Sequence, residues 1–196
     1  MTTLAGTGIA GFSGDGGVAS DATLNQPYCC ALSPDKKRML IADIRNQRLR
    51  SIDLGTRIIS TLAGNGNRGK PLEGVDAVTS PLAGPRAACE ANDGTTYLVL
   101  REGHALVAIK RGILRTVVNI AGTSGYGGDN GPALTALLKG PKYVCMDHLQ
   151  RVLIVDTENH CVRCFDPSTA KISLVAGVPT KPGSTVGDTW TTTRLR

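Results

Sequence analysis

An internal repeat constrains this chain more than any other feature of its sequence. An aliphatic residue followed by Ala-Gly occurs at 4–6, 62–64, 120–122 and 175–177, so the triplet returns after 58, 58 and 55 residues. A leucine three residues before a proline keeps the same phase, at positions 24 and 27, 82 and 85, and 138 and 141. Because two separate landmarks recur in step, the chain is predicted to consist of repeated structural units.

Each unit contains four short aliphatic runs separated by turn signals. In the first unit the runs are YCCALSPD (28–35), RMLIAD (38–43), RLRSIDL (48–54) and RIISTLAG (57–64). The third unit repeats the order as KYVCMD (142–147), RVLIVD (151–156), CVRCFD (161–166) and KISLVAG (171–177). Four consecutive antiparallel strands are typical of a propeller blade, and helical periodicity is nowhere convincing. The sequence therefore predicts an all-β fold, a β-propeller of four-stranded antiparallel blades with three blades present.

These units are expected to form one domain over 1–196. The units span approximately 1–60, 61–118 and 119–177, and 178–196 is expected to be the loop that leads into a further blade. Inner strands are predicted near 28–32, 87–90 and 143–146. Leu195 stands where each earlier unit places its leucine before the proline, which favours a continuation beyond this segment.

Two stretches resemble the signature of the NHL repeat β-propellers. They are IADIRNQRLRSID (41–53) and IVDTENHCVRCFD (154–166), in which an apolar strand ends in Asp and is followed by Asn, any residue, Arg or Cys, an aliphatic residue and Arg. The middle unit, LVLREGHALVAIK (98–110), lacks both the Asp and the Asn. The resemblance implies a ring of about six blades, so the chain is expected to be a piece of a longer protein. Exposed blade faces would then favour self-association.

Composition and charge exclude some classes of partner. Of 196 residues, 22 are basic and 16 acidic, which gives a net charge of +6 without any basic block, and only 4% are aromatic. Nucleic acid is therefore a disfavoured partner. No run approaches the roughly 20 apolar residues of a membrane helix, so a soluble segment with no membrane partner is expected. No signal peptide can be read, and the six cysteines fit no disulfide framework, so the localisation stays open.

The loop-rich end of the blades is the predicted binding face. In a four-stranded blade, the loop into the inner strand and the loop between the second and third strands open on the same side, where variation is tolerated. The polar residues expected there are Asp43, Arg45, Asn46, Arg101, Glu102, Asp156, Glu158, Asn159 and His160. For Asp43 and Asp156 the alternative interpretation is turn capping, with Asn46 and Asn159 bonded to backbone in the same bend.

Other motifs have structural explanations that are preferred to catalytic ones. Asp15 and Asp129 in glycine loops could offer carboxylates to calcium, but each is a single carboxylate and fits turn formation. Cys161 and Cys164 have the CxxC spacing of redox or zinc sites, yet on one strand they face opposite sides and are expected to be buried. His160 lacks a nucleophile partner. Two GxGxxG matches lack the helix that a dinucleotide needs. No catalytic residue, metal site or cofactor is predicted.

Three functions from different classes remain. The preferred one is a non-catalytic scaffold that binds a ligand or protein on the loop face, since blade construction explains every motif. The first alternative is a metal-dependent hydrolase resembling the gluconolactonases, which are six-bladed relatives with acidic and Asn ligands in the central channel. The second is an RNA-binding NHL propeller.

Overall fold

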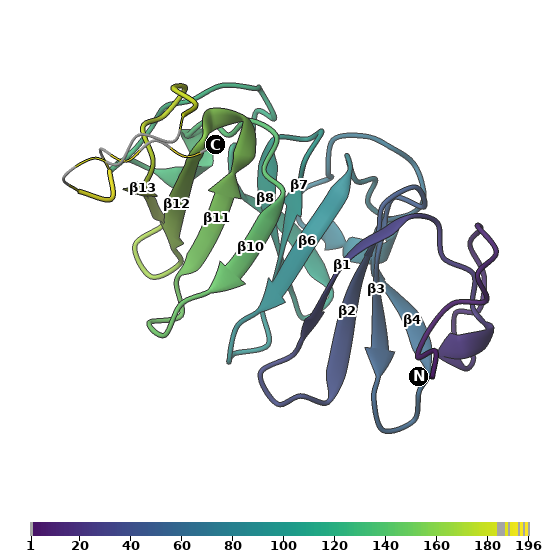
Figure 1. The fold of residues 1–196 in the computed structure, drawn as a ribbon. Helices are drawn as coiled ribbons and strands as arrows, with labels where there is room; N and C mark the ends of the chain where they lie inside the picture. The colour runs from purple at the N-terminus through teal and green to yellow at the C-terminus, as the bar shows by residue number, and fades with distance from the viewer. Residues whose placement is uncertain (1, 184–186, 188, 192, 194, 196) are drawn as a thin grey trace.

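Three antiparallel sheets stand side by side in an arc (Figure 1). The computed structural model describes residues 2–183, 187, 189–191, 193 and 195. The predicted loop at 178–196 therefore lies partly outside the described residues. Among the described residues, no helix is long and apolar enough to cross a membrane.

Each sheet is one blade whose strands follow chain order. Blade 1 contains β1 (Pro27–Leu32), β2 (Arg38–Asp43), β3 (Arg48–Asp53) and β4 (Ile59–Ala63). Blade 2 contains β6 (Pro85–Glu90), β7 (Thr96–Leu100), β8 (Ala105–Lys110) and β9 (Ile113–Val118), with the two-residue β5 (Val75–Asp76) paired outside β9. Blade 3 contains β10 (Tyr143–Met146), β11 (Val152–Asp156), β12 (Cys161–Asp166) and β13 (Lys171–Ala176). The predicted all-β class and four-stranded blades are confirmed.

The three inner strands lie next to one another, with β6 between β1 and β10 (Figure 1). They coincide with the predicted inner strands. Packing between blades forms the core, because aliphatic side chains on facing sheets interdigitate. Blades 1 and 2 share a cluster that includes Leu40, Leu49, Leu98 and Leu100. Blades 2 and 3 share one that includes Val99, Leu106, Ile154 and Phe165.

A β-bulge recurs at the same place in every blade. Between the third and fourth strands the register skips one residue, at Leu62 in blade 1, Val117 in blade 2 and Val175 in blade 3. A bulge bends the strand and re-aims neighbouring side chains. In blades 1 and 3 the third-strand residues beside the bulge are Arg50 and Arg163.

The long loops that precede the blades also repeat. Each contains a short 3-10 turn, η1 (Ala19–Asp21), η2 (Ala77–Thr79) or η3 (Ala133–Thr135), that begins with a fully buried alanine. A fourth turn, η4 (Thr157–Asn159), joins β11 to β12. The carbonyls of Ala19, Ala77 and Ala133 accept from the backbone N–H of Gly6, Gly64 and Asn119, at 2.9, 2.9 and 3.1 Å. In the second and third loops these bonds hold the loop against the end of the preceding blade.

One landmark of the repeat does not have the expected structural position. Gly64 and Gly177 directly follow the fourth strand, but Ile120-Ala121-Gly122 lies beyond β9, and Asn119 occupies the equivalent position. Asn119 has a φ of 59°, in the left-handed region, where Gly64 and Gly177 have 94° and 97°. Asn tolerates this region better than most residues, so it replaces the glycine without breaking the turn. Its side chain then enters the loop face of blade 2.

Apolar side chains on the inner strands of the two outer blades predict self-association. Tyr28 and Leu32 of β1 are 56% and 50% exposed, and Tyr143 of β10 is 48% exposed. Because exposed apolar surface favours association, we expect the purified chain to form dimers as its concentration rises. Multi-angle light scattering measures this directly, and the Tyr28→Lys/Tyr143→Lys variant should shift towards the monomer. A monomer at every concentration would contradict the expectation.

Candidate functional site

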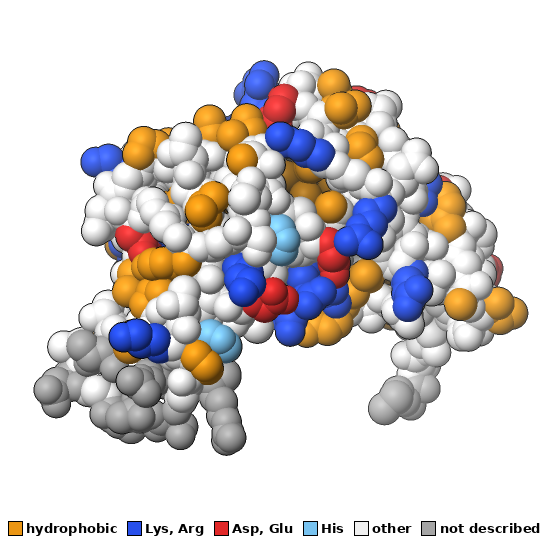
Figure 2. Space-filling model, turned by 90° about the horizontal axis from the view of Figure 1, so that it is seen from above, with side chains coloured by type: hydrophobic (Ala, Val, Ile, Leu, Met, Phe, Trp, Pro, Cys, Tyr) orange, Lys and Arg blue, Asp and Glu red, His pale blue; other side chains and the backbone are white. Residues whose placement is uncertain are grey.

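The nine predicted loop-face residues divide into two groups. Asp43, Asp156 and Asn159 are fully buried and Asn46 is half-buried, so these four act inside the protein. The remaining five, Arg45, Arg101, Glu102, Glu158 and His160, keep some exposure. Figure 2 views this face and shows acidic and basic side chains interleaved around a histidine near its middle.

In blade 1 the signature residues clamp a glycine loop to the sheet. Asp43 accepts from the backbone N–H of Asn25 and from Asn46 Nδ2, each at 2.8 Å, and Asn46 also donates to the carbonyl of Gly11 at 2.7 Å. The fully buried Arg50 guanidinium lies 3.5 Å from Asp43 and 2.7 Å from Asp15. Asp43 and Asn46 therefore bond to each other within the bend, as turn capping requires, but the backbone bond of Asn46 goes to Gly11, 35 residues away, and not to the same bend.

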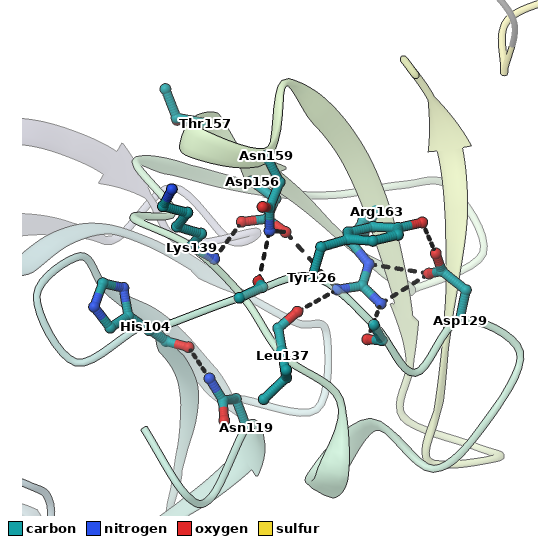
Figure 3. Close-up of polar contacts among 12 residues, drawn as sticks. His104, Asn119, Tyr126, Asp129, Leu137, Lys139, Asp156, Thr157, Asn159 and Arg163 are labelled. Carbon is teal, nitrogen blue, oxygen red and sulfur yellow. Dashed lines mark hydrogen bonds and ion pairs between the residues drawn. The ribbon is translucent and has the colours of Figure 1, made fainter. Parts of the chain in front are cut away.

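Blade 3 contains the same clamp (Figure 3). Asp156 accepts from the Lys139 backbone N–H at 2.7 Å and from Asn159 Nδ2 at 2.8 Å. Arg163 donates to Asp129 at 2.8 Å and to the Leu137 carbonyl at 2.6 Å, and lies 3.8 Å from Asp156. The loop carboxylates that could have offered oxygens to calcium hold arginines instead, since Asp129 pairs with Arg163 as Asp15 pairs with Arg50.

Aromatic rings complete both clamps. The Arg48 and Arg50 guanidinium carbons lie 3.7 and 4.8 Å from the centre of the Phe12 ring, and that of Arg163 lies 5.1 Å from the centre of Tyr126. The Tyr126 hydroxyl donates to Asp129, and burial raises the Tyr126 pKa well above its ordinary value. These arginines are thus surrounded by protein groups.

Blade 2 lacks this clamp altogether. Leu100 stands where blades 1 and 3 have the buried aspartate, Val107 where they have the arginine, and Gly103 where they have the asparagine. Leu100 and Val107 are both fully buried. Removing one member of a buried ion pair leaves an uncompensated charge, whereas replacing both with apolar groups is tolerated. Glu73, which takes the loop position of Asp15 and Asp129, bonds instead to the N–H and Oγ1 of Thr116 at 2.9 and 2.5 Å.

A pocket of about 350 Å³ lies at this altered position, on the loop face of blade 2. Its walls include Glu102, Gly103, Ala105 and Asn119 from the blade side, and residues 68–71 of the glycine loop. Asn119 Nδ2 donates to the carbonyls of His104 and Thr123, each at 2.8 Å. Asn119 Oδ1 and Glu102 Oε2 are buried acceptors that lack a hydrogen bond within the part of the chain that the structure describes. Such atoms are costly to leave without a donor.

An ion-pair network borders this pocket and joins blades 2 and 3. Glu102 Oε1 accepts from Arg86 at 3.2 Å and from Arg101 at 2.9 Å, and Arg101 reaches Glu158 at 2.8 Å. Two glycines make room for the carboxylates, because a Cβ on Gly84 would lie 1.3 Å from Glu102 Oε2 and one on Gly140 would lie 2.5 Å from Glu158. The structure therefore brings Arg101, Glu102 and Glu158 together.

His104 joins this network, although its sequence position near a turn gave no reason to select it. Its Nδ1 accepts from the Gly140 backbone N–H at 3.1 Å, and burial lowers its pKa below the ordinary value, so the ring is neutral at pH 7. Arg45 lies apart and donates to Gln26 at 3.0 Å. His160 ends η4 with a left-handed φ of 56°.

The cysteines offer no reactive pair. Cys161 and Cys164 lie three residues apart on β12, are 2% and 5% exposed, and are unlinked, as are the other four. Burial raises the Cys161 pKa to about 12, so its thiol is protonated at neutral pH. Their predicted burial is confirmed. Within the described residues, no three His, Cys, Asp or Glu side chains are grouped so that they could hold a metal ion.

The buried pair in blade 3 predicts a pH-dependent stability. Burial raises the Asp156 pKa to about 6 from 3.8. A carboxyl whose folded pKa is raised stabilises the fold most below its unfolded pKa, and this contribution is lost as the pH rises through its folded pKa. Between pH 4 and 7, we expect the free energy of unfolding of the wild type to fall by up to about 3 kcal/mol relative to Asp156→Asn. Urea unfolding across this range measures both proteins, and a constant difference would contradict the prediction.

The paired replacement in blade 2 predicts a non-additive mutant cycle. Leu100→Asp and Val107→Arg should each destabilise by about 3 kcal/mol or more, because each buries one charge without its partner. The double variant should lose at least about 1 kcal/mol less than the sum, since the two charges restore the pair seen in blades 1 and 3. Urea denaturation measures all four proteins, and strictly additive losses would show that no pair forms.

Comparison with known proteins agrees with this architecture. The sequence model of the NHL repeat family matches residues 138–165. The chain is 28% identical over 182 residues to the protein SUPPRESSOR OF QUENCHING 1, chloroplastic, of Arabidopsis thaliana. The matched region covers 90% of this chain but only 17% of that protein.

Solved structures share the fold at low identity. A Bacteroides thetaiotaomicron protein of unknown function matches 85% of this chain and 39% of its own, with a TM-score of 0.63 and 18% identity. An auxiliary nutrient binding protein from Bacteroides ovatus matches 81% of this chain and 39% of its own, with a TM-score of 0.59 and 17% identity. An inactive variant of virginiamycin B lyase from Staphylococcus aureus matches 80% of this chain and 46% of its own, with a TM-score of 0.52 and 13% identity. The chain spans less than half the length of each of these proteins. Residues 138–165 match the NHL repeat, the same signature residues are in place in blade 1, and the chain has the fold of part of a β-propeller.

Proposed function

We propose that this chain is a non-catalytic binding module whose ligand enters the loop-face pocket of blade 2. One observation carries the proposal: the blade that lacks the structural clamp has a pocket in its place, with two buried acceptors that have no donor among the described residues. If the loop face served only to hold the blades together, blade 2 would be expected to contain the same clamp as blades 1 and 3.

The state of the other polar residues supports binding rather than catalysis. Asp43 and Asp156 are enclosed by amides and arginines, so neither carboxylate is open to a substrate or to a metal. The Glu158 carboxylate is paired with Arg101, and the His104 ring nitrogen Nδ1 accepts a backbone bond, so this nitrogen is not free to take a substrate proton. Glu102 is paired with Arg86 and Arg101 through Oε1, and we assign its Oε2 as an acceptor for the ligand.

The pocket favours a ligand that carries hydrogen-bond donors. Glu102 Oε2 and Asn119 Oδ1 both accept, and an N–H or O–H group brought to either would satisfy it. Arg68 and Lys70 of the glycine loop add positive charge at the rim. A small polyol, an amino acid or a polar side chain of a partner protein has this chemistry. The likenesses to an auxiliary nutrient binding protein and to a lyase, at 17% and 13% identity, both show the fold alone.

Blocking the pocket mouth tests the proposal. Ala121 is exposed and lines the pocket, so Ala121→Trp adds bulk there without entering the core. We expect at least one member of a panel of monosaccharides, amino acids and lysine-containing tripeptides to raise the melting temperature of the wild type by about 2 °C or more, and to lose this effect in the variant.

Ser124→Trp provides the matched control, because Ser124 is exposed on the same loop outside the pocket. It should keep the full effect of the ligand. Hydrolysis of small lactones by the wild type with added divalent metal would favour the lactonase alternative and overturn the non-catalytic assignment. Equal melting shifts in the wild type and Ala121→Trp would show that the ligand binds elsewhere.

A further inference from the structure

We propose that a groove between blades 2 and 3, at the opposite end of the strands from the loop face, binds an extended acidic peptide with an aromatic or aliphatic anchor. The groove has a volume of about 1040 Å³ and opens where β7 begins and where β8 and β12 end. This inference is independent of the blade 2 pocket.

The floor of the groove is apolar and aromatic. Tyr97 of β7 and Phe165 of β12 meet edge to face with ring centres 6.2 Å apart. Ala108 and Val117 line the blade 2 side, and Leu134 of η3, which is 42% exposed, lines the blade 3 side. Aromatic and aliphatic walls of this kind anchor one apolar side chain of a partner.

The Tyr97 hydroxyl gives the groove a hydrogen-bond donor. Tyr97 lines the groove although the residue is only 6% exposed, and its hydroxyl is not among the buried polar atoms without a partner in the described part of the chain. A tyrosine of this kind offers a bound partner both an apolar ring and a polar tip. Burial raises the Tyr97 pKa to about 12, so the group stays protonated and can donate. A backbone carbonyl of a bound peptide is a suitable acceptor.

The rim of the groove determines the charge of the occupant. Lys110 pairs with Asp93 at 2.7 Å, which neutralises both. Arg111 and Arg115 are exposed and form no ion pair within the described part of the chain. Two uncompensated guanidinium groups beside an apolar floor favour a partner with carboxylates flanking its anchor.

A neighbouring hollow favours an extended chain over a compact small molecule. It measures about 480 Å³, lies on the blade 1 side, and shares Asp93, Lys110 and Arg111 with the main groove. The basic turn at 110–112 therefore stands between two adjoining depressions. A small molecule fills one of them, whereas an extended peptide spans the turn and places side chains in both.

Fluorescence anisotropy with a defined probe tests this inference on the full chain. The probe is a fluorescein-labelled acidic hexapeptide of glutamates with one central phenylalanine, and the reference probes are the same peptide with alanine at the centre and a basic version with lysines. We expect saturable binding of the first probe, at least about tenfold weaker binding of the alanine version, and no saturable binding of the basic one.

Two variants locate the binding. Arg111→Glu/Arg115→Glu should weaken binding of the acidic probe by at least about tenfold. Lys36→Glu/Arg57→Glu makes the same change of charge on exposed turns of blade 1, and should leave binding within about twofold. Ala108→Leu narrows the groove, and should also weaken binding while the melting temperature is retained. Ala121→Trp should have no effect on this probe, which separates the groove from the loop-face pocket.

Three outcomes would overturn the inference. One is the absence of saturable binding up to about 1 mM probe. Another is equal binding of the phenylalanine and alanine probes, which would indicate general charge attraction. The last is an equal loss in the arginine variant and the blade 1 control.

Discussion

The burial of two arginines is the interaction on which the loop face depends. Arg50 and Arg163 are fully buried, and each spans the distance from a strand aspartate to a carboxylate in the preceding glycine loop. The loops have little secondary structure of their own, so these charge-assisted bonds and the asparagine amides hold them in place. A buried charge without its partners would cost several kcal/mol, which makes the whole set of residues interdependent.

This interdependence explains why blade 2 differs at several positions at once. Leu100, Val107 and Gly103 replace the aspartate, the arginine and the asparagine together, so no charge is left alone. Asn119, in the left-handed position that glycine occupies in the other blades, contributes a side chain to the same space. The two ends of blade 2 thereby differ in chemistry, with uncompensated acceptors at the loop face and uncompensated arginines beside an apolar groove at the other end.

Much of the architecture could be predicted because propeller blades are built from local contacts. Repeat spacing, four aliphatic runs and turn residues specified the strands and the inner strands correctly, since each strand pairs with its neighbour in sequence. The misplaced landmark was Ile120-Ala121-Gly122. Its sequence matches the other triplets, but the residue in the structural position of their glycine is Asn119, three residues before Gly122. Asn119 accepts the backbone conformation of a glycine, and a pattern search for glycine passes over it.

The sequence by itself determined the blade count of this segment, the strand order and the residues that could form the signature. Only the tertiary structure decided which of those residues are open to a ligand. Asp43, Asn46, Asp156 and Asn159 look like surface loop residues in sequence, but the glycine loops fold over them. The two asparagines bond to loop carbonyls 35 and 34 positions away, and the two aspartates to loop N–H groups 18 and 17 positions away. His104 and Gly140 meet through blade packing, as do Arg101 and Glu158, and Tyr97 and Phe165. Burial and contact between blades depend on how whole sheets stack, and no local pattern encodes that.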